Sequence, residues 1–225
     1  MERSGSPSEG MVGAQTMLIF PCIPWAEHRY STFIPVETNP LKPSRGGRLA
    51  EVPDLGRAYN EVMAMLPDGG WACLLDHDVM FTTRGWYDQL CQAVAHDSQG
   101  TFVPYLSRGG ARWQNIQRAF PETEPDGHDI RYHRELGTRL AQQDGIAYVD
   151  VTAHGHQGGG ALMLLSKANW QAVGGFPSGC LTIDHAMFAR LRRAGRHIYL
   201  MSRVYLYHWK RGAGECHPAF VYTDG

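Results

Sequence analysis

The apolar run WACLL at residues 71–75 is followed at once by Asp76, His77 and Asp78. Apolar residues without polar alternation predict a strand that is buried on both faces, as in a sheet covered by helices on each side. The residues after such a strand lie at its carboxyl end, where open α/β sheets bind their ligands. This one feature predicts both a covered central sheet and a polar site at its edge.

Short apolar segments alternate with segments of helical periodicity along the rest of the chain. Helices are expected from about Leu55 and over 86–96, 128–143, 167–173 and 183–194, the last with Gly195 as its C-cap. Strands are expected at 17–20, 71–75, 101–104, 147–151, 161–165, 197–201 and 204–207, and mostly irregular chain at 25–53 and 105–127. This alternation is typical of an α/β fold with a mostly parallel central sheet flanked by helices. We expect a single domain over 17–225 after a flexible leader at 1–16.

Charge and cysteine content narrow the functional classes only a little. The formal net charge of −1 neither favours nor excludes a nucleic-acid ligand, because a local basic patch is compatible with a neutral total. Five cysteines without a CxxC pair argue against a disulfide framework or a zinc ribbon, and predict reduced thiols in the cytoplasm. No apolar run approaches the roughly 18 residues that span a bilayer. The N-terminus has no signal-peptide pattern, so we expect no membrane association.

Asp76 and Asp78 are the strongest candidates for metal ligands. Hard cations such as Mg²⁺ and Mn²⁺ prefer oxygen ligands and usually share them with substrate phosphates. The pair therefore predicts a divalent cation that bridges to a diphosphate; the alternative is an Asp-rich turn that caps the next helix. His208 ends the last apolar strand, and is either a packed core histidine or a third metal ligand, since imidazole suits Mn²⁺.

Asp184 is the third candidate, at the start of a predicted helix with an apolar face. A carboxylate at a helix N-terminus is stabilised by the helix dipole, so Asp184 can be a simple cap. It can equally be a general base that deprotonates a hydroxyl nucleophile. The composition of the segment does not choose between these roles.

Six segments occur in the order found in metal-dependent glycosyltransferases of the GT-A fold, and the chain resembles the family 2 type over roughly residues 17–212. The segments are LIFPCIP, LGRAYNEVM, LLDHDVMF, GGGALMLLSKANWQAVGGF, TIDHAMFARLRRAGRHI and VYLYHWKR. The resemblance implies a single Rossmann-like GT-A domain with a mostly parallel sheet. It also implies transfer of a hexosyl or N-acetylhexosaminyl group from a nucleotide-sugar, a UDP-sugar by expectation, to an acceptor hydroxyl.

The resemblance assigns roles to particular residues. It implies Mn²⁺ or Mg²⁺ held by Asp76, Asp78 and His208, and it implies Asp184 as the base if the reaction inverts the sugar; a retaining reaction is the alternative. It places donor contacts at Pro21, Ile23, Arg57, Asn60, Asp76, His77, Gly159 and Gly160. The sequence departs from the family at Tyr59, because an Arg often stands there, immediately before the helix Asn. Arg57 would then have to take the role of that Arg. The sequence departs again at Ile183, where a second acid often precedes the catalytic one.

The acceptor is the least constrained part of the prediction. One subgroup that the chain resembles is the compact phage-type enzymes that glycosylate 5-hydroxymethylcytosine in double-stranded DNA, which would act in the host cytoplasm. Arginines that can follow a phosphate backbone, with Trp113 to stack on a base, are Arg108, Arg112, Arg118, Arg131, Arg134 and Arg139. A glycan, a protein or a small molecule is the alternative acceptor. A metal-dependent phosphohydrolase or nuclease and a non-catalytic sugar-nucleotide binder are the alternative classes.

Overall fold

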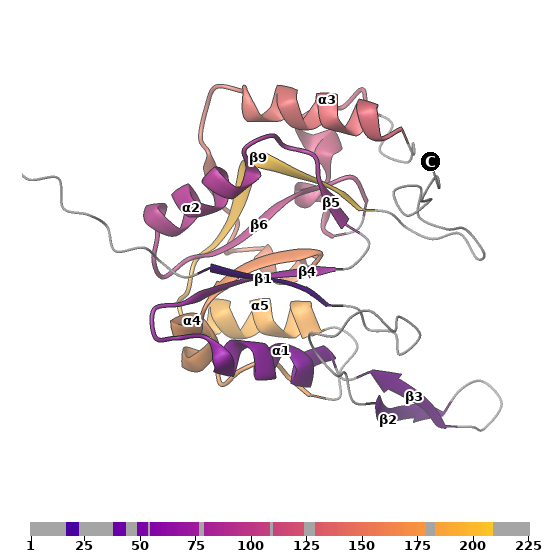
Figure 1. Ribbon diagram of the computed structural model, residues 1–225, viewed down its shortest axis with the longest axis vertical. Coiled ribbons are helices and arrows are strands. Elements are labelled where there is room, and N and C mark those ends of the chain that lie inside the picture. Colours follow the sequence, from indigo (N-terminus) through magenta and orange to yellow (C-terminus); the bar gives the residue numbers. More distant parts are fainter. Residues whose placement is uncertain are drawn as a thin grey trace, which may run out of the picture.

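A seven-stranded sheet forms the centre of the protein (Figure 1). The computed structural model describes residues 17–22, 38–43, 49–53, 55–76, 79–108, 110–123, 129–178 and 183–208. The path through the sheet is β1 (Met17–Cys22), β4 (Trp71–Asp76), β8 (Leu162–Ser166), β6 (Thr101–Leu106), β9 (Ile198–His208) and β5 (Val79–Phe81), and β7 (Tyr148–Asp150) also pairs with β9. The α/β class predicted from the sequence is confirmed.

The sheet is mixed, so the prediction of a mostly parallel sheet is wrong. Strands β1 and β4 are parallel, as are β6 and β9. The other pairings, β4–β8, β6–β8, β5–β9 and β7–β9, are antiparallel. The physical reason is that a continuous apolar run reports burial on both faces. Helix layers provide that burial whatever the direction of the neighbouring strand, so the run does not encode strand direction.

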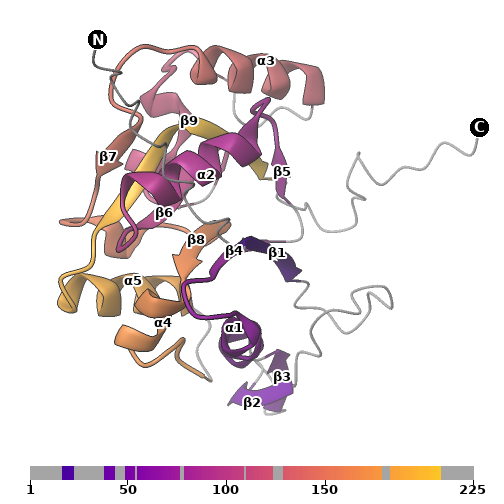
Figure 2. The same cartoon turned by 60° about the vertical axis from the view of Figure 1, so that its left-hand side comes forward.

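Helices cover both faces of the sheet, as Figures 1 and 2 both show. On one face lie α1 (Leu55–Met65), α4 (Lys167–Ala172) and α5 (Ile183–Arg193), and on the other lie α2 (Trp86–His96) and α3 (Ile130–Ala141). Successive side chains of β4 point to opposite faces of the sheet, and so pack under different helices. Ala72 and Leu74 belong to the core cluster that includes residues of α1 and α5, whereas Cys73 packs in the cluster that includes α2.

Local sequence patterns located most elements within a few residues. Helix α2 begins and ends where its periodicity predicts, and Gly195, at a φ of 69°, follows α5 in the left-handed region that favours glycine. Three features were not predicted. The antiparallel pair β2 (Thr38–Pro43) and β3 (Leu49–Pro53) lies in the segment expected to be irregular, β5 was not expected, and the two expected C-terminal strands are the single strand β9.

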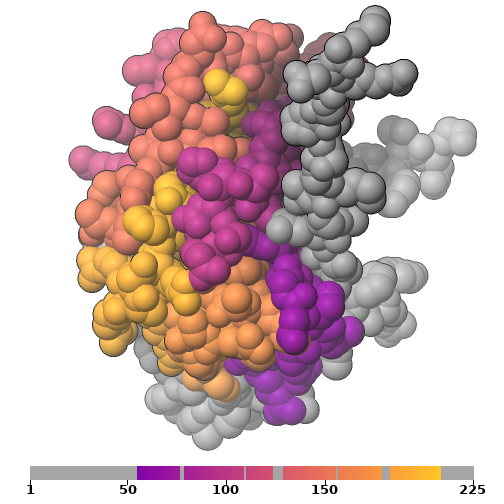
Figure 3. Space-filling model, turned by 90° about the vertical axis from the view of Figure 1, so that its left-hand side faces the viewer, coloured from indigo at the N-terminus to yellow at the C-terminus, as the bar shows by residue number. Residues whose placement is uncertain are grey.

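Residues far apart in the sequence meet on the face drawn in Figure 3, where magenta residues border orange and yellow ones. The turn after α2 accounts for this meeting. The amide of Asn169, in α4, donates to the backbone carbonyls of Gln99 and Gly100 at 2.8 and 3.0 Å. On the other side of the turn, the Tyr199 hydroxyl of β9 donates to Asp97 at 3.1 Å. Among the described residues, no helix combines the length and apolar character needed to cross a membrane.

Candidate functional site

A pocket of about 180 Å³ brings together three residues that were singled out in the sequence: Asp76, Gly160 and Asp184. Asp76 is the last residue of β4, and Asp184 lies in the first turn of α5. The remaining lining residues are mostly apolar: Leu55, Tyr59, Met163, Phe176 and Ile183. We call this cavity the carboxylate pocket. It has two acidic side chains in an otherwise mainly apolar wall.

The carboxylate of Asp184 is held in a fixed orientation. Its Oδ2 accepts a hydrogen bond from the backbone N–H of Gly160 at 2.9 Å, and its Oδ1 accepts one from the backbone N–H of His185 at 2.8 Å. The position in the first turn of α5 adds the favourable interaction with the helix dipole. These contacts fix the position of the carboxyl group, as a helix cap requires and as a general base also requires.

The glycines of the Gly158–Gly160 segment are packed closely against the protein, and Gly159 and Gly160 leave no room for a side chain unless their neighbours shift. A Cβ on Gly160 would lie 2.7 Å from the Asp184 Cβ, and one on Gly159 would lie 2.8 Å from the Gly110 Cα. A Cβ on Gly158 would lie 3.1 Å from the Trp113 ring. The family resemblance places donor contacts at Gly159 and Gly160, and those contacts stay a prediction. In the structure the glycines allow close approach to Asp184 and to the 110–113 segment.

Gln114 is a site residue that no sequence pattern indicates. Its side chain is fully buried, and its amide makes two hydrogen bonds with one residue, Gly159. Nε2 donates to the Gly159 carbonyl at 3.1 Å, and Oε1 accepts from the Gly159 N–H at 2.8 Å. The next residue, Gly160, donates to Asp184, so Gln114 holds the backbone that orients the carboxylate. A glutamine in a segment predicted to be a loop carries no periodicity or motif that would reveal this role.

His208 pairs with the strand that begins directly after the predicted Asp-x-Asp motif. It is the last residue of β9 and pairs with Val79, the residue that follows Asp78. Its backbone N–H donates to the Ser107 hydroxyl at 2.8 Å, and its ring Nδ1 lies 3.2 Å from the Arg108 carbonyl. Because a carbonyl only accepts, this contact places the ring proton on Nδ1 and the lone pair on Nε2, which is the nitrogen a metal would use.

The metal site as a whole remains a prediction. Asp78 and His77 lie outside the described residues, as does Ile23. Within the part of the chain that the structure describes, no group of three or more His, Cys, Asp or Glu residues is placed to hold a metal ion. A carboxylate such as that of Asp76 and an imidazole such as that of His208 are ligands of the kind that Mn²⁺ accepts.

The predicted donor contacts have definite places in the fold. Pro21 lies in β1 opposite Leu75, and Arg57 pairs with Glu61 at 3.2 Å on the surface of α1. The Asn60 side chain fixes the turn after α4. Its Oδ1 accepts from the Phe176 N–H at 2.7 Å and from the Trp170 indole at 2.8 Å, and its Nδ2 donates to the Phe176 carbonyl at 3.0 Å. These bonds give Asn60 a structural role, and its contact with a donor stays a prediction.

Trp113 was expected in an open loop that could close over an acceptor, with stacking on a base. The structure places it in a short 3-10 helix, η1 (Arg112–Gln114), with the ring partly buried against the core on the α1 and α5 face. Its ring also meets His154 edge to face, with the ring centres 5.7 Å apart. The Trp113 ring thus packs against the protein's own core.

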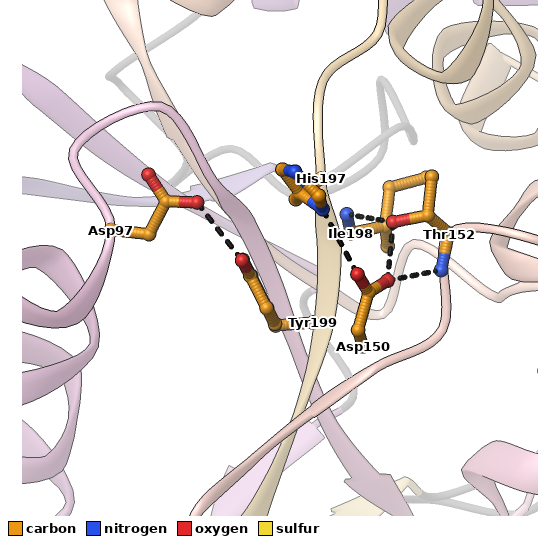
Figure 4. A network of polar contacts seen from close by, with 6 residues as sticks. All are labelled: Asp97, Asp150, Thr152, His197, Ile198 and Tyr199. Carbon is orange, nitrogen blue, oxygen red and sulfur yellow. Dashed lines mark hydrogen bonds and ion pairs between the residues drawn. The ribbon is translucent and has the colours of Figure 1, made fainter.

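A polar network at the edge of the sheet lies on elements other than those that carry the carboxylates (Figure 4). Asp150 accepts from the backbone N–H of Thr152 at 2.8 Å and lies 2.9 Å from the His197 ring nitrogen. Burial raises the pKa of the Asp150 carboxyl, but the hydrogen bonds from Thr152 and His197 outweigh it, so that the pKa is lowered. Burial, and then the bond to Asp97, raises the pKa of Tyr199 to about 12. The network joins β7 to β9, and none of its residues lines the carboxylate pocket.

Searches with protein-family models and among curated proteins found no match to this sequence. The function of the protein is therefore inferred from the geometry of the site and from the order of the sequence motifs.

Proposed function

We propose that this protein is a metal-dependent glycosyltransferase of the GT-A type, which transfers a sugar from a nucleotide-sugar, a UDP-sugar in the first instance, to an acceptor hydroxyl. The observation that carries the proposal is the carboxylate pocket, where Asp76 and Asp184 line the same cavity. These two residues are the ones that the motif order assigns to the metal and to the base.

The roles within the pocket follow from the positions of the two carboxylates. Asp76, with Asp78 and His208, would hold a Mn²⁺ or Mg²⁺ ion. That ion, when bound, stabilises the negative charge of the leaving nucleoside diphosphate. The chain between Asp76 and Val79 contains only His77 and Asp78, and Val79 pairs with His208, which supports a site shared by these three residues.

Asp184 would act as the base on the acceptor. The N–H groups of Gly160 and His185 fix its carboxylate, which can take the proton as the acceptor oxygen attacks the sugar carbon. The apolar wall that includes Tyr59 and Phe176, whose rings meet edge to face at 5.1 Å, limits the access of water to that carbon. For the acceptor itself we carry forward 5-hydroxymethylcytosine in DNA, with a glycan, a protein or a small molecule as the alternatives.

The test is incubation with Mn²⁺ and a panel of UDP-sugars, with UDP release as the readout. A transferase is expected to hydrolyse one donor slowly in the absence of acceptor and to need the metal. No turnover with any donor would indicate a binder. Cleavage of phosphate esters without any dependence on the sugar would indicate a hydrolase and would overturn the proposal.

The role of Asp184 has its own test in a matched pair of variants. Asp184→Asn keeps the size of the side chain and removes the base, so the transfer rate should fall by about a hundredfold or more while donor binding persists. Asp144→Asn, at an exposed position, makes the same chemical change away from the pocket and should transfer at the native rate. Transfer near the native rate in Asp184→Asn would make Asp184 a helix cap only.

A further inference from the structure

A second pocket, of about 410 Å³, opens beside the segment that holds Gly159. It is lined by residues of a single stretch: Gly110, Ala111, Arg112, Asn115, Gln117 and Arg118. Two of its lining residues are arginines, and none is acidic. Arginine presents several N–H donors in a planar fork that matches a phosphate, so the wall has the chemistry of an oxyanion site. We call it the arginine pocket.

The positive charge of the arginine pocket is not neutralised by its own segment. Glu122 is the only acidic residue between positions 110 and 123, and it pairs with Arg139 of α3 at 3.2 Å. Arg112 and Arg118 form no ion pair with any residue that the structure describes. The pocket is therefore lined by two cationic residues that have no carboxylate partner among the described residues.

The turns that carry the two arginines are held by hydrogen bonds from other side chains of the same segment. Asn115 Oδ1 accepts from the Gln117 N–H at 2.8 Å, and Gln117 Nε2 donates to the Thr123 carbonyl at 3.0 Å. The segment is thus held in shape before any ligand binds, which reduces the entropy lost on binding.

The arginine pocket and the carboxylate pocket are joined by one stretch of backbone. Gly110 lines the arginine pocket and lies against Gly159, and Gln114, from the same segment, makes two hydrogen bonds with Gly159. The following residue, Gly160, lines the carboxylate pocket and donates to Asp184. A ligand that reached into both pockets would bring its phosphate to the arginines and another group toward Asp184.

We propose that the arginine pocket binds a phosphate ester of the molecule that accepts the sugar. The phosphate would be held by Arg112 and Arg118, and the acceptor hydroxyl would extend past the Gly159–Gly160 backbone to Asp184. The assignment to the acceptor rests on the proposed function, whereas phosphate binding itself does not. The phosphate comes either from a polynucleotide or from a small phosphorylated molecule, and the experiment separates these sources.

The first measurement uses the full chain without metal or donor. Inorganic phosphate is titrated while the Trp113 indole N–H and the Gln114 side-chain NH₂ signals are followed by ¹H–¹⁵N NMR. We expect saturable shifts of both signals. The double variant Arg112→Ala/Arg118→Ala should bind phosphate at least about tenfold more weakly, because two charge-assisted contacts are removed. Both arginines are exposed, so the variant should fold normally.

The matched control removes the same charge elsewhere. Arg192 and Arg193 are exposed in the last turn of α5 and donate to the backbone carbonyls of Ala153 and Ala189. Arg192→Ala/Arg193→Ala should leave the phosphate affinity within about twofold, because exposed charges at a distance are screened. An unchanged affinity in the Arg112/Arg118 variant, or an equal loss in the control, would overturn the proposal.

The same titration with a short single-stranded oligonucleotide and with glycerol 3-phosphate identifies the source of the phosphate. Tighter arginine-dependent binding of the oligonucleotide indicates a polynucleotide, and tighter binding of glycerol 3-phosphate indicates a small acceptor. In the transfer assay, the arginine variant should raise the acceptor KM at least about tenfold. Absence of any sugar transfer would refute the proposed function and leave the binding result intact. Transfer with an unchanged acceptor KM would refute the acceptor assignment alone.

Discussion

Gln114 offers the sharpest test of how the carboxylate pocket is built. The substitution Gln114→Leu keeps the approximate size of the side chain but removes both hydrogen bonds to Gly159. A neutral hydrogen bond contributes about 1 kcal/mol net, so the loss of two bonds costs about 2 kcal/mol of unfolding free energy. Gly159 is partly exposed, so water can replace part of the interaction, and we expect a total near this value.

Gln114→Glu separates the two bonds and adds a dependence on pH. A carboxylate still accepts from the Gly159 N–H, but it cannot donate to the Gly159 carbonyl, and burial of its charge is unfavourable. Protonation restores the donor, so the folded state should raise the pKa of this introduced carboxyl above its usual value of about 4.3. The folded state then binds the proton more tightly than the unfolded state. The stability deficit relative to wild type should therefore be largest near neutral pH and should shrink as the pH falls.

Urea unfolding followed by circular dichroism measures both effects. Gln143→Leu makes the same change as Gln114→Leu at an exposed position after α3, and should alter the unfolding free energy by less than about 0.5 kcal/mol. A Gln114→Leu variant as stable as this control would refute the stabilising role of the two Gln114 hydrogen bonds. The predicted pH dependence is wrong if Gln114→Glu shows the same deficit at every pH from about 4.5 to 7.5, since then no proton restores the bond.

Three further changes test other contacts. Gly160→Ala places a Cβ 2.7 Å from the Asp184 Cβ, so it should cost about 1–3 kcal/mol in urea unfolding, and a native stability would contradict the close approach. Asn60→Ala removes two hydrogen bonds with Phe176 and one with the Trp170 indole, and should cost about 2–4 kcal/mol by the same assay. A loss below about 0.5 kcal/mol would show that the turn holds without them. Asp150, whose pKa is lowered in the fold, contributes stability that is present above about pH 4 and is lost as the pH falls through its folded pKa. The melting temperatures of wild type and Asp150→Asn should therefore converge below pH 4, and a constant difference would contradict the assignment.

The sequence by itself determined the local elements and several residues of the pocket. The apolar run before Asp76 became β4, and the pattern around Asp184 became the first turn of α5. These features are encoded locally, because periodicity and chain flexibility act over a few neighbouring residues.

The tertiary structure decided which segments meet. The antiparallel entry of β8 between β4 and β6 depends on pairing between distant strands, and an apolar run reads the same in either direction. The bonds by which the Asn60 amide fixes the turn at Phe176 form because the packing of α1 brings the two residues together. Gln114 acts on Asp184 only through the backbone of Gly159 and Gly160, which lie far from both in the sequence. Such relations arise from side-chain packing across the fold, and no local pattern contains them.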